Sequence, residues 1–71
     1  MPVKIRELKA RLRKAGFYSR SGKGSHTVWK HPNLPGARLV LSGADGDDAQ
    51  RYQEADVQSM LDKLQNKSRL E

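Results

Sequence analysis

The chain of 71 residues contains no cysteine and only four aromatic residues: one tryptophan, one phenylalanine and two tyrosines. Without cysteine no disulfide can brace the fold, and a chain of this length buries only a thin core. It also lacks an apolar run long enough to span a bilayer and an apolar segment at its N-terminus. We therefore expect a single small domain, residues 1–71, that is soluble and cytoplasmic and makes no contact with a membrane.

Acidic residues are scarce in the first part of the chain. Residues 1–30 hold nine Lys/Arg and one acid, a balance of +8, whereas residues 31–71 hold five Lys/Arg and seven acids, a balance of −2. Such asymmetry is typical of a protein with a polyanion-binding face. The simpler interpretation is a basic surface that only keeps the protein soluble. Membrane binding is disfavoured because the basic segment carries few large apolar anchors.

Two segments have the apolar spacing of an amphipathic helix. The first covers residues 3–15 and is followed by Gly16, which suits the left-handed residue that ends a helix. The second begins near Glu54, and residues 66–71 are expected to fray, with the last two interpreted as a cloning remnant. The two apolar stripes comprise Ile5, Leu8, Leu12 and Ala15, and Val57, Met60, Leu61 and Leu64.

Three short segments between the helices are rich in β-branched and aromatic residues, which favours strands. The strands are expected at residues 17–20, 25–31 and 37–42. The connections are expected to be a glycine-rich turn at 21–24, a proline-containing loop at 31–36 and a polar, acidic loop at 43–53. This order predicts an α+β fold with a three-stranded antiparallel sheet and both helices on one face. The other sheet face is left to solvent or to a partner.

Alternation along the second strand decides which side chains reach that open face. His26 and Lys30 share one face and Trp29 lies on the other, which the helices must cover because it is the more apolar. A simple register across the 31–36 loop places Lys30 opposite Arg38, and His26 opposite Ser42. Like charges directly opposite each other are unfavourable, which a bound phosphate would explain. A register slip of one residue would instead bury His26.

His26 is the best candidate for acid–base chemistry, because imidazole titrates near neutral pH. RNA cleavage needs a group that takes a proton from a 2′-hydroxyl and a group that protonates the leaving oxygen. It also needs positive charge near the phosphorane, which lysine and arginine can supply without a metal. The alternative is an ordinary surface histidine at the start of a strand.

Other polar residues favour structural roles. His31 is five positions from His26, on the opposite strand face, so we expect a structural histidine before the proline loop. Ser25 lacks a visible base and acid, and is expected to satisfy backbone groups in the turn. The Gly22–Ser25 segment lacks the spacing of a P-loop. The acidic run at residues 45–48 lacks the ligand pattern of a calcium loop and is expected to be solvated.

The Gly24-Ser25-His26 triplet is followed by an aromatic residue and then by Lys30-His31-Pro32. In these motifs the chain is similar to the HicA family, the toxin half of HicA–HicB toxin–antitoxin pairs. The likeness extends over nearly the whole chain. It implies a double-stranded-RNA-binding-domain-like fold, α-β-β-β-α. It also implies a ribosome-independent mRNA interferase that acts without a metal, and a HicB antitoxin that covers the active site. The family's catalytic histidine maps onto His26, with Gly24 and Ser25 as its companions.

Two features depart from the family's pattern or lie outside it. Residues 43–53 are longer and more acidic than the segment common in the family. Lys23, Lys30 and Arg38 are assigned to RNA phosphate from charge and position alone. The leading hypothesis is a metal-independent RNA endonuclease with His26 as general acid and base. The alternatives are a non-catalytic RNA-binding module of the same fold, and an interaction protein with an acidic partner and no direct role in RNA binding.

Overall fold

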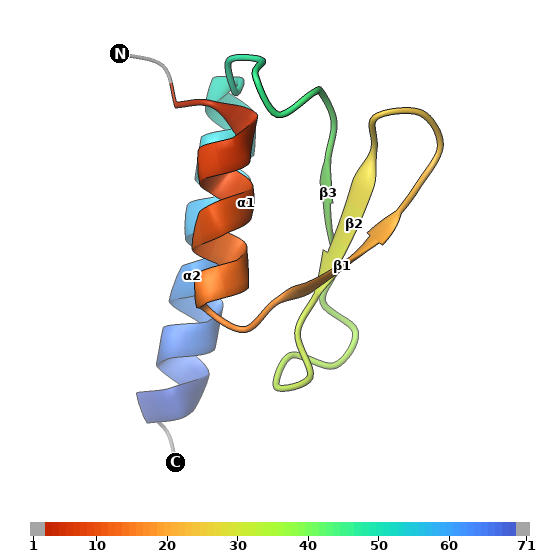
Figure 1. The fold of residues 1–71 in the computed structure, drawn as a ribbon. Coiled ribbons are helices and arrows are strands. Elements are labelled where there is room, and N and C mark those ends of the chain that lie inside the picture. Colours follow the sequence, from red (N-terminus) through yellow and green to blue (C-terminus); the bar gives the residue numbers. More distant parts are fainter. Residues whose placement is uncertain (1–2, 70–71) are drawn as a thin grey trace.

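The computed structural model describes residues 3–69, with side chains through residue 66. The elements follow in the order α1 (Ile5–Lys14), β1 (Tyr18–Ser21), β2 (Thr27–Lys30), β3 (Leu39–Leu41) and α2 (Arg51–Arg69). Figure 1 shows α1 and α2 packed together on one face of the sheet, while no described element covers the other face. This is the predicted α+β arrangement, a double-stranded-RNA-binding-domain-like fold.

The sheet is antiparallel throughout, with the strand order β1-β2-β3. Across β2 and β3, Trp29 pairs with Leu39, and continuation of the same register brings Lys30 opposite Arg38. The alignment expected from the 31–36 loop is therefore confirmed. On the other side of β2, Tyr18 pairs with Lys30.

Trp29 lies at the centre of the core and has no solvent exposure. Its indole N–H donates to the Thr27 hydroxyl at 2.9 Å, so its one polar group is satisfied. The Arg13 guanidinium lies 5.4 Å from the centroid of the Trp29 ring, within the range of a cation–π contact. This confirms the prediction from alternation that Trp29 points toward the helices. The other core residues are Ile5, Leu8, Leu12, Phe17, Leu39, Leu41, Ala49, Val57 and Met60.

The second helix begins earlier than the sequence predicts, at Arg51 rather than near residue 54. Gln53 explains the early start. Its buried side chain accepts the Gln50 backbone N–H at 2.8 Å and donates to the Ser42 carbonyl at 2.9 Å. Gln53 at N3 forms half of a capping box, but Gln50 at the N-cap is not a preferred capping residue, so the start signal in the sequence is weak. The helix extends to Arg69, past the expected beginning of fraying; residues 70–71 lie outside the described part of the chain.

The acidic loop between β3 and α2 is attached to the beginning of α1. The backbone carbonyls of Asp47 and Asp45 accept the N–H groups of Ile5 and Arg6, at 2.9 and 3.1 Å. These N–H groups belong to the first turn of α1, where no helical carbonyl is available to them. The sequence predicts a solvated loop here. Its acidic side chains are exposed, but its main chain caps a helix.

The acidic side chains of this loop also form the two ion pairs found among the described side chains. Lys4 pairs with Asp48, and Lys9 pairs with Asp45. The hydrogen bond from Lys9 and the positive charge of its ammonium group hold the pKa of Asp45 below its usual value. The loop is therefore joined to α1 by both its main chain and its side chains.

Candidate RNA-cleavage site

The β1–β2 turn is closed by two backbone hydrogen bonds. The Gly22 N–H donates to the His26 carbonyl at 2.8 Å, and the His26 N–H donates to the Lys23 carbonyl at 3.2 Å. β2 therefore begins at Thr27, two residues later than predicted. Ser25 and His26 belong to the turn rather than to the strand.

The His26 ring is exposed and has a defined orientation. Its Nδ1 lies 2.9 Å from the Lys23 carbonyl oxygen. A carbonyl can only accept a hydrogen bond, so Nδ1 carries the hydrogen and the neutral ring has its free lone pair on Nε2. Among the side chains that the structure describes, none bonds to this Nε2. The ring can therefore accept a proton from a molecule in solvent.

The two companions of His26 in the sequence have different structural roles. The Ser25 hydroxyl accepts the Gly43 backbone N–H at 3.2 Å, which ties the turn to the chain that leaves β3. Ser25 thus satisfies a backbone group, as predicted, but that group lies outside its own turn. Gly24 has a φ of +62°, a conformation that L side chains rarely adopt, and a Cβ atom there would meet no neighbour within 4 Å.

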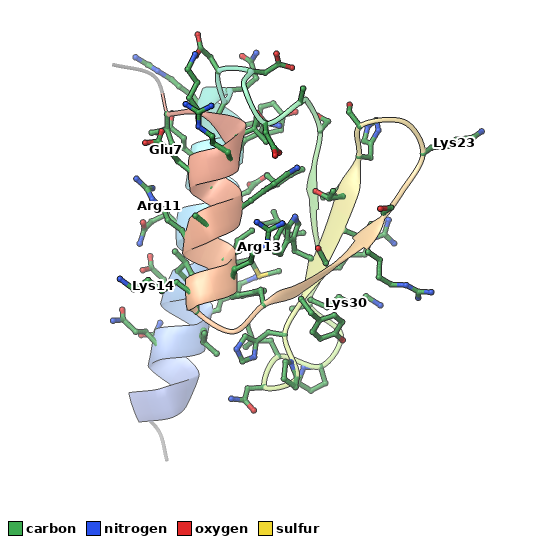
Figure 2. All side chains as sticks on the ribbon, viewed as in Figure 1. Glu7, Arg11, Arg13, Lys14, Lys23 and Lys30 are labelled. Carbon is green, nitrogen blue, oxygen red and sulfur yellow. The ribbon has the colours of Figure 1, made fainter. Side chains whose placement is uncertain are left out.

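The predicted cations do not all surround His26. Figure 2 shows Lys23 at the tip of the β1–β2 turn and Lys30 toward the opposite end of the sheet. Four residues of strand separate the Cα atoms of His26 and Lys30 by about 13 Å. Lys23 is therefore the predicted cation in the same turn as the imidazole. Lys30 and Arg38 can contact RNA only at some distance from it.

Lys30 and Arg38 instead lie with a third cation, Arg20, which no pattern in the sequence indicates. The three side chains line a shallow hollow of ≈ 290 Å³ on the open sheet face, together with Ser21 and Val28. None of these lining residues is acidic. Arg20 pairs with Val28 across the β1–β2 ladder, so the hairpin register, once known, would have placed it here. Three cations without a carboxylate suit the binding of phosphate.

His31 has the structural role that alternation predicts. It is buried, its Nε2 lies 3.0 Å from the Ala15 carbonyl, and its Nδ1 accepts the Asn33 N–H at 3.0 Å. Its ring meets the Phe17 ring edge-on, with the centroids 4.8 Å apart. Both ring nitrogens are engaged inside the protein, so His31 is not placed to exchange protons with RNA.

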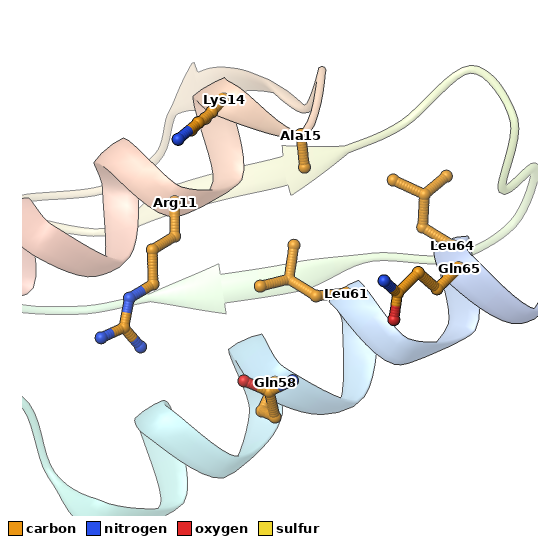
Figure 3. Close-up of a pocket in the computed structure, with 7 residues that line it drawn as sticks. All are labelled: Arg11, Lys14, Ala15, Gln58, Leu61, Leu64 and Gln65. Carbon is orange, nitrogen blue, oxygen red and sulfur yellow. The ribbon is translucent and has the colours of Figure 1, made fainter.

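A groove of ≈ 470 Å³ lies on the helical side of the molecule, between α1 and α2. Ala15, Leu61 and Leu64 form its apolar part, and Arg11 and Lys14 border it on α1 (Figure 3). None of its lining residues is a histidine or a carboxylate, so it offers no group for acid–base chemistry near neutral pH.

Residues 3–69 were also considered for a metal site and for a membrane-spanning helix, and they contain neither. No group of three or more histidine, aspartate and glutamate side chains is arranged to hold a metal ion within this range. Neither of the two helices is both long enough and apolar enough to cross a membrane.

Comparison with known families identifies the family to which the chain belongs. A family model described as the HicA toxin of bacterial toxin–antitoxin systems matches residues 5–64. The matched range runs from the beginning of α1 through all three strands and most of α2, and it includes the β1–β2 turn. No curated protein and no solved structure matches the chain.

Proposed function

Since the chain belongs to the HicA family of bacterial toxin–antitoxin toxins, we propose that it is an mRNA interferase, an endoribonuclease that cleaves RNA with His26 and without a metal. The observation that carries the proposal is the orientation of the His26 ring. Its Nδ1–H is held by the Lys23 carbonyl at 2.9 Å, which leaves an exposed Nε2 with a free lone pair. A general base needs such a free lone pair within reach of the proton that it removes.

In the proposed reaction, Nε2 of His26 takes the proton of a ribose 2′-hydroxyl. The 2′-oxygen then attacks the adjacent phosphorus and the bond to the 5′-oxygen breaks. The leaving 5′-oxygen receives a proton from the imidazolium or from water, so the products end in a 2′,3′-cyclic phosphate and a 5′-hydroxyl. Lys23, in the same turn, supplies positive charge near the reacting phosphate.

The remaining predicted site residues act on RNA binding in this proposal. Lys30 and Arg38 hold phosphates away from the bond that is cut, because the length of β2 separates them from His26. Gly24 and Ser25 shape the turn and attach it to the sheet. A HicB-type antitoxin would neutralise the enzyme by covering the same turn and excluding RNA.

The test is a cleavage assay with purified protein and RNA in the presence of EDTA. The parent should cleave, and His26→Ala should lose roughly 100-fold or more in rate, the usual contribution of a general base. Gln58→Ala changes an exposed residue of α2 on the helical side and should cleave like the parent. The product ends should carry cyclic phosphate by mass spectrometry.

Three results would count against this proposal. Undiminished cleavage by His26→Ala would remove the histidine from the reaction. A parent protein that binds RNA but cleaves none would instead favour the non-catalytic RNA-binding module. Cleavage that disappears in EDTA and returns with a divalent cation would overturn the metal-independent mechanism.

A further inference from the structure

Tyr18 is a large side chain left half exposed on the open sheet face. Its exposure is 50%, and it is the first residue of β1. It pairs directly with Lys30, and residues directly opposite on antiparallel strands project to the same side. Lys30 projects away from the core, because its neighbour Trp29 projects into it. The Tyr18 ring therefore stands beside a cation on the uncovered face.

A hollow of ≈ 250 Å³ adjoins this ring. Tyr18 and Lys30 line it on the sheet side, and Leu34, Pro35 and Arg38 line it on the side of the β2–β3 loop and its continuation. Lys30 and Arg38 also line the neighbouring hollow that contains Arg20. The region thus combines an exposed aromatic ring, apolar loop side chains and three cations.

We infer that Tyr18 and this hollow form a base-binding subsite for single-stranded RNA. One nucleobase stacks on the Tyr18 ring, and Arg20, Lys30 and Arg38 hold the phosphates on either side of it. Aromatic stacking next to a cationic track is how proteins bind single strands with little sequence preference. The subsite therefore accepts purines and pyrimidines, and it requires an unpaired base.

The place of the subsite relative to His26 rests on the proposed function. Lys30 is about 13 Å along β2 from His26, so the stacked base belongs to a nucleotide a few positions from the bond that is cut. Tyr18 is then a positioning residue, which fixes the register of the RNA on the sheet while the turn carries out the chemistry.

The fold provides a matched control in Tyr52. This second tyrosine is 60% exposed but lies on α2, away from the open sheet face. It does not line either of the two cationic hollows. Removing its ring tests whether any exposed tyrosine contributes to RNA binding.

The experiment measures the binding of labelled, unstructured RNA to His26→Ala protein, so that cleavage does not disturb the measurement. In this background Tyr18→Ala should weaken binding roughly tenfold, Tyr18→Phe should bind within about twofold of the unchanged tyrosine, and Tyr52→Ala should have no effect. Thermal unfolding of each variant shows whether β1 is retained. Fully paired RNA should not distinguish Tyr18→Ala from its parent.

A series of RNAs with one abasic nucleotide at successive positions then locates the stacked base. An abasic nucleotide at one position should weaken binding to the protein that retains Tyr18. The same abasic RNA should bind Tyr18→Ala as well as the intact RNA does. A folded Tyr18→Ala variant with parental affinity would overturn the subsite, and so would a Tyr18→Phe variant as weak as Tyr18→Ala. These outcomes are independent of catalysis: a Tyr18 effect without cleavage by the parent would support the subsite and overturn the ribonuclease.

Discussion

The two histidines show how hydrogen-bond partners decide the role of a residue. In His26, Nδ1 donates to the Lys23 carbonyl, and Nε2 is left to the solvent. In His31 the ring is buried, Nδ1 accepts the Asn33 N–H, and Nε2 donates to the Ala15 carbonyl. The same side chain is therefore an available base in one place and a bridge between β2 and the end of α1 in the other.

Replacement of His31 should accordingly affect folding, and replacement of His26 should not. His31→Ala leaves the partly buried Ala15 carbonyl and Asn33 N–H without these partners and opens a cavity beside Phe17. We expect a loss of about 1–3 kcal/mol in the free energy of unfolding. His26→Ala should stay within about 0.5 kcal/mol of the parent, because its ring is exposed. Urea denaturation of both variants measures the difference, and equal stabilities would contradict the assignment of roles.

At the scale of elements, the acidic loop before α2 and the beginning of α1 form one unit. The first N–H groups of an isolated helix lack carbonyl partners. Here the carbonyls of Asp45 and Asp47 accept two of them, and the Val3 carbonyl accepts the Ala49 N–H at 2.7 Å. The acidic loop thus has a structural function: it joins the beginnings of the two helices.

The Asp45–Lys9 pair makes this unit sensitive to acid. The pKa of Asp45 is lower in the folded protein than its ordinary value of 3.8. The pair's contribution is therefore present above about pH 4, and it is lost as the pH falls through the folded-state pKa. Asp45→Asn should lower the melting temperature slightly near neutral pH, and the difference should shrink toward about pH 3. Asp45 is fully exposed, so the effect is small.

Asp62→Asn is the matched control for this pH series. Asp62 is exposed on α2 and accepts a hydrogen bond from Gln58, which an asparagine oxygen can still accept. Its substitution should not reproduce the pH-dependent difference. A gap between the parent and Asp45→Asn that widens on acidification would contradict the sign derived from the pKa.

At the scale of the whole molecule, the uncovered sheet face is one of two positively charged surfaces, and the exposed side of α1 is the other. The open face carries Arg20, Lys30 and Arg38, and the adjoining turn carries Lys23. The two ion pairs of the described side chains lie instead at the contact between α1 and the acidic loop. The cations of the open face form no ion pair among the described side chains, so this face and the β1–β2 turn can attract a polyanion.

Phosphate binding by the open sheet face predicts the salt dependence of RNA binding. For single strands, the logarithm of the affinity falls with the logarithm of the salt concentration, with a slope of roughly −0.7 for each phosphate contact. Arg20→Gln and Arg38→Gln, in the His26→Ala background, should each reduce the steepness by roughly 0.7. Arg11→Gln, on the border of the helical groove, should leave the slope unchanged. Equal slopes for all variants would remove the open face from the RNA-binding surface.

The order of elements, most of the core and the β2–β3 register could be predicted from the sequence, because they depend on local patterns. The helical stripe around Leu8 and Leu12, and the alternation around Trp29, identify the buried faces by their periods. The loop that contains Pro32 and Pro35 then leaves little freedom for the pairing of the strands it joins.

Only the tertiary structure decided how the site is assembled. Closure of the hairpin at Gly22 placed His26 in a turn, where the Lys23 carbonyl decides which ring nitrogen stays free. Pairing of β1 with β2 brought Tyr18 and Arg20 beside Lys30. The helix caps supplied by Asp47 and Gln53 were likewise not visible in advance. All of these features depend on contacts between residues that are distant in the chain or on the exact end of a strand. Distant contacts and strand ends leave no periodic pattern in the sequence, because the packing of the elements determines both.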